Sequence, residues 1–436
     1  MNGNVNEIYE LMQIIRHFIP NLGLWMKQIR DFRQQKKIKY PAEVLLFTRI
    51  LAYLTQLQSV RGITFKFNQD EAIENIGILL SCEMEEMFHH DTLTYFLKHL
   101  APEEIEELRY KIVYHLIRGR YFEDFRLMGK YWRVGIDGTG VYNFKERHCD
   151  KCLTKKLGNG ETLYYHPVLE AKLIVGDMAI SIETEFIENP DPNPSKQDCE
   201  RNAFVRPAEK LKKRFPRLPI CILGDSLYAC QRVFEICERN GWKYIITFKE
   251  GSIRELYKEY EGIKMLGKGN RLEFETVETK QEYAWVQGLE HAGHAVEVFE
   301  CIETQKETGE STRFVWVTNF HVTKNKIIEL GNGGRGRWKV ENEGFNEQKN
   351  GGYNLEHAYA KNYNAVKNHY LLLQIAHLNG QLCENGSLLR DAIKHLHGSF
   401  KNFCQKILED LRCRRVDPEE LRKKLSEKLQ IRFSTD

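Results

Sequence analysis

The sequence predicts an α/β protein built around a mixed β-sheet flanked by helices, and two observations lead to this prediction. Residues 1–130 carry apolar residues mainly at helical spacing, whereas strand patterns begin at residue 131. From there strand and helix patterns follow one another, an order that joins parallel strands by right-handed crossovers. An antiparallel pair at the start of this region makes the expected sheet mixed.

Shifts in pattern divide the 436 residues into five segments. These are a helical N-terminal domain (1–130), a first part of the α/β core (131–250), a β-rich insertion (251–311), a second part of the core (312–385) and a helical C-terminal region (386–436). The N-terminal domain contains helix patterns at 42–56 and 103–118, and it also carries a basic cluster. The cluster fits either phosphate contacts or a solvated helix face, and comprises Lys27, Arg30, Arg33, Lys36, Lys37 and Lys39.

The first core segment has the order of three strands, helix, strand, helix, strand. We expect the second and third strands to form a hairpin through Gly176-Asp177. The predicted strands are 131–137, 163–175, 178–186, 220–223 and 244–248, and the predicted helices are 196–215 and 227–240.

Composition limits the classes of protein to consider. Hydrophobic content of 42% and charged content of 29% are typical of a soluble globular protein. The first residues have no apolar core, and no apolar run reaches the roughly 18 residues of a membrane span, so we expect a cytoplasmic protein without a membrane partner. The net charge of +3 neither requires nor excludes nucleic acid. The 11 cysteines, an odd number, do not indicate a disulfide framework.

Two acidic residues directly follow buried strand patterns. Asp137 ends the apolar run 132–136 before a Gly-Thr-Gly turn, and Asp225 follows the run 220–223. Taken singly, each is more often a turn former, a cap or a surface charge. Ligands of open α/β sheets bind beyond the carboxyl ends of strands, and two carboxylates facing each other there repel unless a cation lies between them. Oxygen ligands of this kind favour Mg²⁺ or Mn²⁺.

A third acid, Glu341, lies on a predicted helix from 336 to 350. Arg337, Glu341 and Phe345 are four residues apart and share one face, with Lys349 one turn further. A carboxylate flanked by bases suits a metal ion together with a phosphate. The same spacing also fits a surface Arg–Glu pair. Considered together, the three acids predict a site for two divalent ions that act on a phosphodiester.

This order of strand Asp, strand Asp, β-rich insertion and helix Glu resembles the DDE transposases of bacterial insertion sequences. RWKVEN, which contains Glu341, is similar to the Arg-Trp-x-apolar-Glu-Asn of the group with a Tyr, Arg, Glu, Lys signature. IDGTG and LGDSLYA resemble the contexts of the family's two aspartates. The resemblance covers roughly residues 130 to 385, and it implies a ribonuclease H-like core.

The chain departs from the family signature at two positions. The signature tyrosine falls on Gly334 and the signature lysine on Gln348, with Lys349 one residue further. Arg337 fixes the register and favours Glu341 over Glu343 as the ligand. In the family an aromatic side chain of the insertion stacks on a displaced base, and the candidates are Trp285 and Trp316, although both also fit a core position.

The resemblance implies a transposase that cleaves and joins double-stranded DNA at the terminal inverted repeats of its own element. Asp137, Asp225 and Glu341 would hold two Mg²⁺ or Mn²⁺ ions, and Arg337 and Lys349 would bind DNA phosphates. The enzyme is expected to act as a homodimer on paired ends and on target DNA, in a bacterial cytoplasm at the nucleoid. The alternatives are a metal-dependent nuclease of the same fold without strand transfer, and a non-catalytic DNA-binding remnant.

A Cys-x-x-Cys sequence is not explained by the proposed catalysis. Cys149 and Cys152 have the spacing of zinc ligands, and His166 follows on a predicted strand. We consider a structural zinc site here, against the alternative of reduced thiols in a loop.

Overall fold

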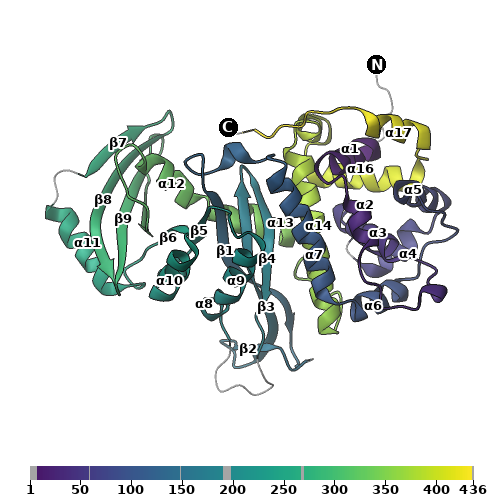
Figure 1. The fold of residues 1–436 in the computed structure, drawn as a ribbon, viewed down its shortest axis with the longest axis horizontal. Helices are drawn as coiled ribbons and strands as arrows, with labels where there is room; N and C mark the ends of the chain where they lie inside the picture. The colour runs from purple at the N-terminus through teal and green to yellow at the C-terminus, as the bar shows by residue number, and fades with distance from the viewer. Residues whose placement is uncertain (1–6, 58, 148, 190–197, 267–269, 435–436) are drawn as a thin grey trace.

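A computed structural model describes residues 7–57, 59–147, 149–189, 198–266 and 270–434. Within them ten strands form one mixed sheet, and a body of helices packs at one end of it (Figure 1). The α/β prediction is therefore confirmed at this level. The N-terminal helices are α1 (Glu7–Phe18), α2 (Leu22–Lys27), η1 (Gln35–Lys37), α3 (Ala42–Leu54), α4 (Val60–Phe67), α5 (Asp70–Leu80), α6 (His90–His99), α7 (Pro102–Arg118) and η2 (Glu123–Phe125).

The two ends of the chain share the helical body. Its C-terminal part consists of α14 (Tyr363–Asn385), α15 (Arg390–Ala392), η5 (Ile393–His397), α16 (Phe400–Cys413) and α17 (Pro418–Ser426). Helices α16 and α17 pack on α1, and the Glu7 amide donates to Asp410 Oδ2 at 3.3 Å. Helix α14 is buried over most of its length, because it contacts α3, α6 and α7 as well as the sheet. Figure 1 shows the purple and yellow helices side by side.

The sheet begins with four antiparallel strands and continues with two parallel ones. The first half contains β1 (Trp132–Phe144), β2 (Leu153–Lys156), β3 (Thr162–Val175), β4 (Met178–Phe186), β5 (Ile220–Gly224) and β6 (Lys243–Thr247). Strand β3 pairs with β1 on one side and with β2 and β4 on the other, while β5 lies between β1 and β6. The predicted β3–β4 hairpin is confirmed, since Val175 faces Met178 across Gly176 at φ +53°.

The first strand is longer than the sequence pattern predicts. We expected it to end at Asp137 in a turn, but β1 continues to Phe144 with an irregularity between Gly140 and Tyr142. The reason is β3, whose 14 residues supply a pairing partner along the whole of this extension. Asp137 instead follows the point where the parallel pairing with β5 ends, at Gly135 and Leu223.

The helices between the strands are shorter than expected. The helix predicted at 196–215 is observed as α8 (Glu200–Ala203) and α9 (Val205–Arg214), and residues 196–197 lie outside the described ranges. In place of the helix predicted at 227–240, the structure has a short 3-10 turn, η3 (Ser226–Tyr228), followed by a shorter helix, α10 (Gln231–Asn240).

The β-rich insertion extends the central sheet. It opens with α11 (Arg254–Leu266), which the strand patterns did not predict, and continues with β7 (Arg271–Glu275), β8 (Thr279–His291) and β9 (His294–Gln305). Strand β10 (Ser311–Thr318) then pairs with both β9 and β6, so the insertion strands join the same sheet. The chain returns to the core through α12 (Ile327–Arg335), η4 (Val340–Asn346) and α13 (Glu347–Asn350).

Candidate active site

The register of β1 and β5 places the two aspartates side by side. Gly135 faces Leu223 in the parallel pair, and Asp137 and Asp225 each follow two residues later. Asp137 Oδ1 accepts from the Gly138 amide at 2.9 Å, and Asp225 Oδ1 accepts from the Leu227 amide at 2.9 Å. Each carboxylate thus accepts from a nearby backbone amide just beyond the last residues of the β1–β5 pairing, the position predicted for ligand-binding residues of α/β sheets.

Glu341 reaches this edge on an irregular helix. We predicted one regular helix over 336–350, but α12 ends at Arg335 and residues 340–346 form a π-helix. A π-helical turn holds more residues than an α-helical turn, so Phe345 leaves the predicted face and its ring is buried beside Lys172. Arg337 and Glu341 both remain next to Asp137.

A glycine in β1 allows the π-helix to approach the sheet. A Cβ atom at Gly135 would lie 2.2 Å from Val340 Cγ2, which is closer than side chains pack. Val340 is fully buried at this contact and directly precedes Glu341. The close approach of η4 to β1 therefore sets the position of the third acid.

We expect Gly135→Ala to lower the free energy of unfolding by about 1–3 kcal/mol, because the added methyl group overpacks against Val340. Val340→Ala in the same chain should restore much of that loss, since it removes the clashing methyl groups. Urea unfolding of both single variants and the double variant measures the coupling. Independent, additive losses would contradict the proposed contact.

A fourth acid, Glu200, belongs to the same cluster and was missed in the sequence. A Cβ atom at Gly138 would lie 2.2–2.6 Å from the three carboxyl atoms of Glu200, so the glycine leaves room for this side chain beside Asp137. Burial, followed by the charges of Asp137 and Asp225, raises the pKa of Glu200 to about 7, and the Tyr228 hydroxyl opposes this rise. The only sequence signal was Gly138 itself, because glycine within a strand often marks a close approach.

Asp137 lies at the centre of the cluster. Burial raises its pKa from 3.8 to about 6; Arg337 and the Gly138 amide lower it, and the charges of Asp225 and Glu341 raise it further. The three predicted acids are therefore brought together. The carboxylate oxygens of these acids and of Glu200 are more widely spaced than a tight metal-ligand cluster: within the described ranges, no three of them all lie within 4.8 Å of one another.

The raised pKa of Asp137 has a consequence for stability. The folded protein holds the proton more tightly than the unfolded chain, so this group favours folding below pH 4 and that contribution is lost as the pH rises through 6. The difference of about two pKa units corresponds to roughly 3 kcal/mol. We expect the metal-free wild type to lose more stability between pH 4 and pH 7 than Asp137→Asn does. Denaturant unfolding at each pH measures this difference, and equal slopes for the two proteins would contradict it.

Basic and aromatic groups border the acids on one side. Arg337 Nη1 lies 3.3 Å from Asp137 Oδ2, and its guanidinium carbon lies 4.6 Å from the centre of the Trp338 ring. Trp338 is 54% exposed, whereas the predicted stacking candidates Trp285 and Trp316 are buried in the core. Arg337, Trp338 and Asp225 line an open cleft of about 500 Å³. The cleft therefore places the Arg337 guanidinium and the exposed Trp338 ring next to the carboxylates.

The lysine predicted to bind phosphate has a different neighbour. Lys349 Nζ forms an ion pair with Glu356 at 3.6 Å. Gln348, at the position of the signature lysine, is fully buried and donates to Gln374 Oε1 at 2.8 Å. Gln348 is therefore part of the core, and no contact in the described ranges links Lys349 to the three acids.

A buried lysine supplies positive charge beneath the π-helix. Lys172 is fully buried on β3, and its Nζ lies 5.0 Å from the centre of the Phe345 ring. Burial lowers its pKa to about 8, while the charges of Glu170 and Glu341 oppose this decrease. Lys172 therefore stabilises negative charge at Glu341 from the side facing the core.

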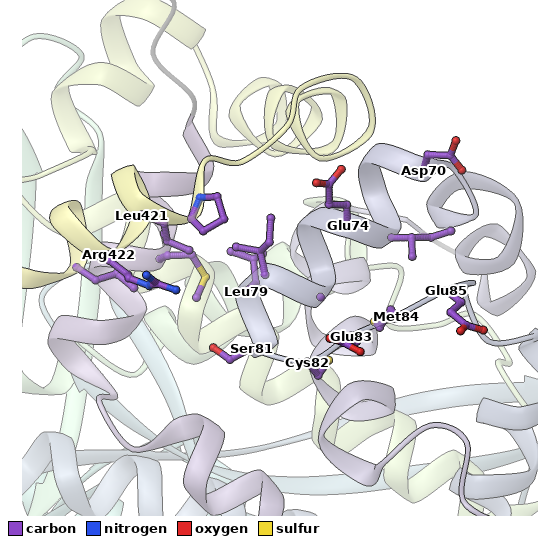
Figure 2. A pocket seen from close by; sticks show the side chains of 16 residues that line it. Asp70, Glu74, Leu79, Ser81, Cys82, Glu83, Met84, Glu85, Leu421 and Arg422 are labelled. Carbon is purple, nitrogen blue, oxygen red and sulfur yellow. The ribbon is translucent and has the colours of Figure 1, made fainter.

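The helical body contains a separate cleft of about 900 Å³ between α5 and α17 (Figure 2). Among the described residues that line it, most of the polar side chains are carboxylates and Arg422 is the only base. The acidic residues are Asp70, Glu74, Glu83 and Glu85. Because such a surface repels phosphate, we do not assign this cleft to DNA.

Comparison with known proteins does not identify the chain. No protein-family model matches it, and no curated protein matches it in sequence. In the described ranges, no helix is both long enough and apolar enough to cross a membrane. Function must therefore be inferred from the site.

Proposed function

We propose that this protein is a DDE transposase with a ribonuclease H-like core, which cleaves and joins the DNA ends of its own element. The observation that carries the proposal is the convergence of Asp137, Asp225 and Glu341, three acids separated by whole segments of the chain. The strand order supports it. A sheet ordered β4–β3–β1–β5–β6, with three antiparallel strands followed by two parallel ones, is the arrangement expected of the ribonuclease H-like fold.

The residues fit a pair of hard divalent cations. The cluster offers carboxylate oxygens alone, and oxygen ligands favour Mg²⁺ or Mn²⁺. Burial first, and the charges of neighbouring acids second, raise the pKa values of Asp137 and Glu200, and a cation bound among these carboxylates would oppose both effects. Asp137, Asp225 and Glu341 would hold the two cations. When bound, the ions would activate a water or a 3′-hydroxyl group and stabilise the leaving oxygen in an in-line displacement.

The remaining side chains suit the handling of DNA. Arg337 is bound to Asp137 through one nitrogen, and a cation near Asp137 would free its guanidinium for a non-bridging phosphate oxygen. Trp338 presents an exposed ring on which an unpaired base can stack. We assign this role to Trp338 in place of Trp285 and Trp316, because those two rings are buried.

The basic cluster of the N-terminal region is a weaker candidate for DNA contacts. The segment from 28 to 41 is mostly irregular, so the predicted helix face does not form. Arg30 pairs with Glu104, and Lys39 donates to Glu86 at 2.5 Å. Lys27 at the end of α2 and Lys36 and Lys37 on η1 are exposed, and these three remain the members best placed to reach a phosphate.

A joining assay tests the proposal. The purified full-length chain is incubated with Mg²⁺, a supercoiled target plasmid and linear DNA that carries the sequences flanking its own gene. We expect cleavage at inverted repeats in those sequences, followed by covalent joining to the plasmid. Cleavage without joined product would favour a nuclease, and binding without cleavage would favour a non-catalytic remnant; either result overturns the transposase assignment.

A further inference from the structure

A second cluster of metal-binding side chains lies apart from the acids. The three ligand atoms form a nearly equilateral triangle: Cys149 Sγ lies 3.4 Å from Cys152 Sγ, and His166 Nε2 lies 3.4 Å from one sulfur and 3.5 Å from the other. Around a tetrahedral zinc ion, bond lengths near 2.3 Å to sulfur and 2.0 Å to nitrogen place such atoms about 3.5–3.8 Å apart. The observed triangle has nearly this size.

The fold explains why these residues meet. Leu153 pairs with Tyr165 where β2 joins the edge of β3, so Cys152 and His166 come to lie opposite each other. Cys149 approaches from the preceding turn, in which the Cys152 amide bonds to its carbonyl oxygen at 3.5 Å. Three ligands are thus gathered by one strand pairing and one turn.

Other contacts hold the ligands in place. The His166 ring stacks on Tyr363 of α14 with 4.2 Å between ring centres. Asn189 donates to the Cys152 carbonyl at 2.9 Å, and the Cys152 side chain is fully buried. These contacts come from different parts of the chain, so the orientation of the ligands does not depend on the turn alone.

The chemistry of the ligands favours zinc over a disulfide. A disulfide requires a sulfur–sulfur distance of about 2.05 Å, whereas the two sulfur atoms lie 3.4 Å apart with the His166 imidazole against both. Two thiolates and an imidazole are soft and borderline ligands, which prefer zinc to Mg²⁺. The contrasting set His89, His90 and Asp91 is largely exposed, and His89 Nδ1 accepts from the Asp91 amide at 3.3 Å as a helix cap.

We propose that Cys149, Cys152 and His166 supply three of the four ligands of one tetrahedral zinc ion, which fixes residues 149–156 to the edge of β3. Two exposed lysines, Lys155 and Lys156, lie on the strand that the ion would secure. Tyr142, the β1 partner of His166, follows Asp137 by five residues, or about 16 Å along a strand. The zinc site is therefore distinct from the acidic site and independent of the transposase proposal.

Metal analysis of the full-length protein tests this site. The protein is purified without a histidine tag, supplied with Zn²⁺ and passed through a desalting column before elemental analysis. We expect about one zinc per chain in the wild type and loss of that zinc in Cys149→Ser, Cys152→Ser and His166→Ala. Cys413→Ser and His89→Ala are matched controls, because each removes an exposed thiol or imidazole elsewhere, and both should keep the zinc.

Cobalt substitution tests the wild type without any variant. Co²⁺ in the site should give sulfur-to-cobalt charge-transfer absorption and the visible bands of a tetrahedral ion, and added Zn²⁺ should abolish both. Removal of zinc should also speed proteolytic cleavage within 145–160. A wild-type protein that holds no zinc, or a cobalt spectrum without the sulfur bands, would overturn the proposal. Folding of the variants does not affect this result.

Discussion

Replacing Asp137 with asparagine is expected to lower the rate of DNA strand cleavage at least about a thousandfold. The reason is the loss of a carboxylate that would help to hold the cations, and an interaction of about 4 kcal/mol in the transition state corresponds to this factor. Asp225→Asn and Glu341→Gln should have effects of similar size. Single-turnover cleavage of a labelled end substrate measures each rate, because it isolates chemistry from product release.

Control variants distinguish the loss of a metal ligand from a general disturbance of the fold. Glu290→Gln removes an exposed carboxylate from β8 and should leave cleavage unchanged. Combining Asp137→Asn with Asp225→Asn should cost little more than either change alone, since residues that act as one unit are not additive. Near wild-type cleavage by Asp137→Asn would refute the proposed site.

A change of metal provides a direct sign of coordination. Asp137→Cys places a softer sulfur ligand at the same position, which Mg²⁺ accepts poorly and Mn²⁺ accepts better. We expect this variant to be inactive with Mg²⁺ and partly active with Mn²⁺. Equal inactivity with both ions would indicate that Asp137 acts in some way other than metal binding.

The positions of the two aspartates could be predicted from local pattern. Each follows a short apolar run, and the parallel pairing of β1 with β5 ends two residues before both acids, where ligands of α/β sheets bind. The hairpin through Gly176 could also be predicted from the sequence, because a glycine between two alternating apolar runs is a strong local signal. These predictions succeeded because the residues that determine the structure lie next to one another in the chain.

The approach of Glu341 depends on tertiary contacts and could not be predicted in detail. Its sequence reads as a regular helix, and only the contact between Gly135 and Val340 shows how closely η4 packs on β1. The full length of β1 could not be predicted either, because the part of the strand beyond Asp137 depends on its pairing with β3. Glu200 was missed because it follows no strand, and its neighbour in space, Gly138, is far away in the sequence.

Replacing Glu200 with glutamine is expected to lower cleavage activity ten- to hundredfold. Its carboxyl group packs on Gly138 beside Asp137, and the charges of Asp137 and Asp225 raise its pKa after burial has done so. With a pKa of about 7, Glu200 is partly protonated near neutral pH and must lose that proton when cations enter the cluster. The residue therefore links metal affinity to pH in the range from 6 to 8.

Calorimetry in buffers of different ionisation enthalpy measures the protons released when Mg²⁺ or Mn²⁺ binds. At pH 6.5 the wild type should release more protons than Glu200→Gln, by up to about one per chain, because glutamine has no proton to lose. Tyr228→Phe is the matched variant. Its hydroxyl lowers the pKa of Glu200, so its removal should shift proton release to higher pH without abolishing it. Identical proton release by wild type and Glu200→Gln would place Glu200 outside the metal site, even if its substitution slows cleavage.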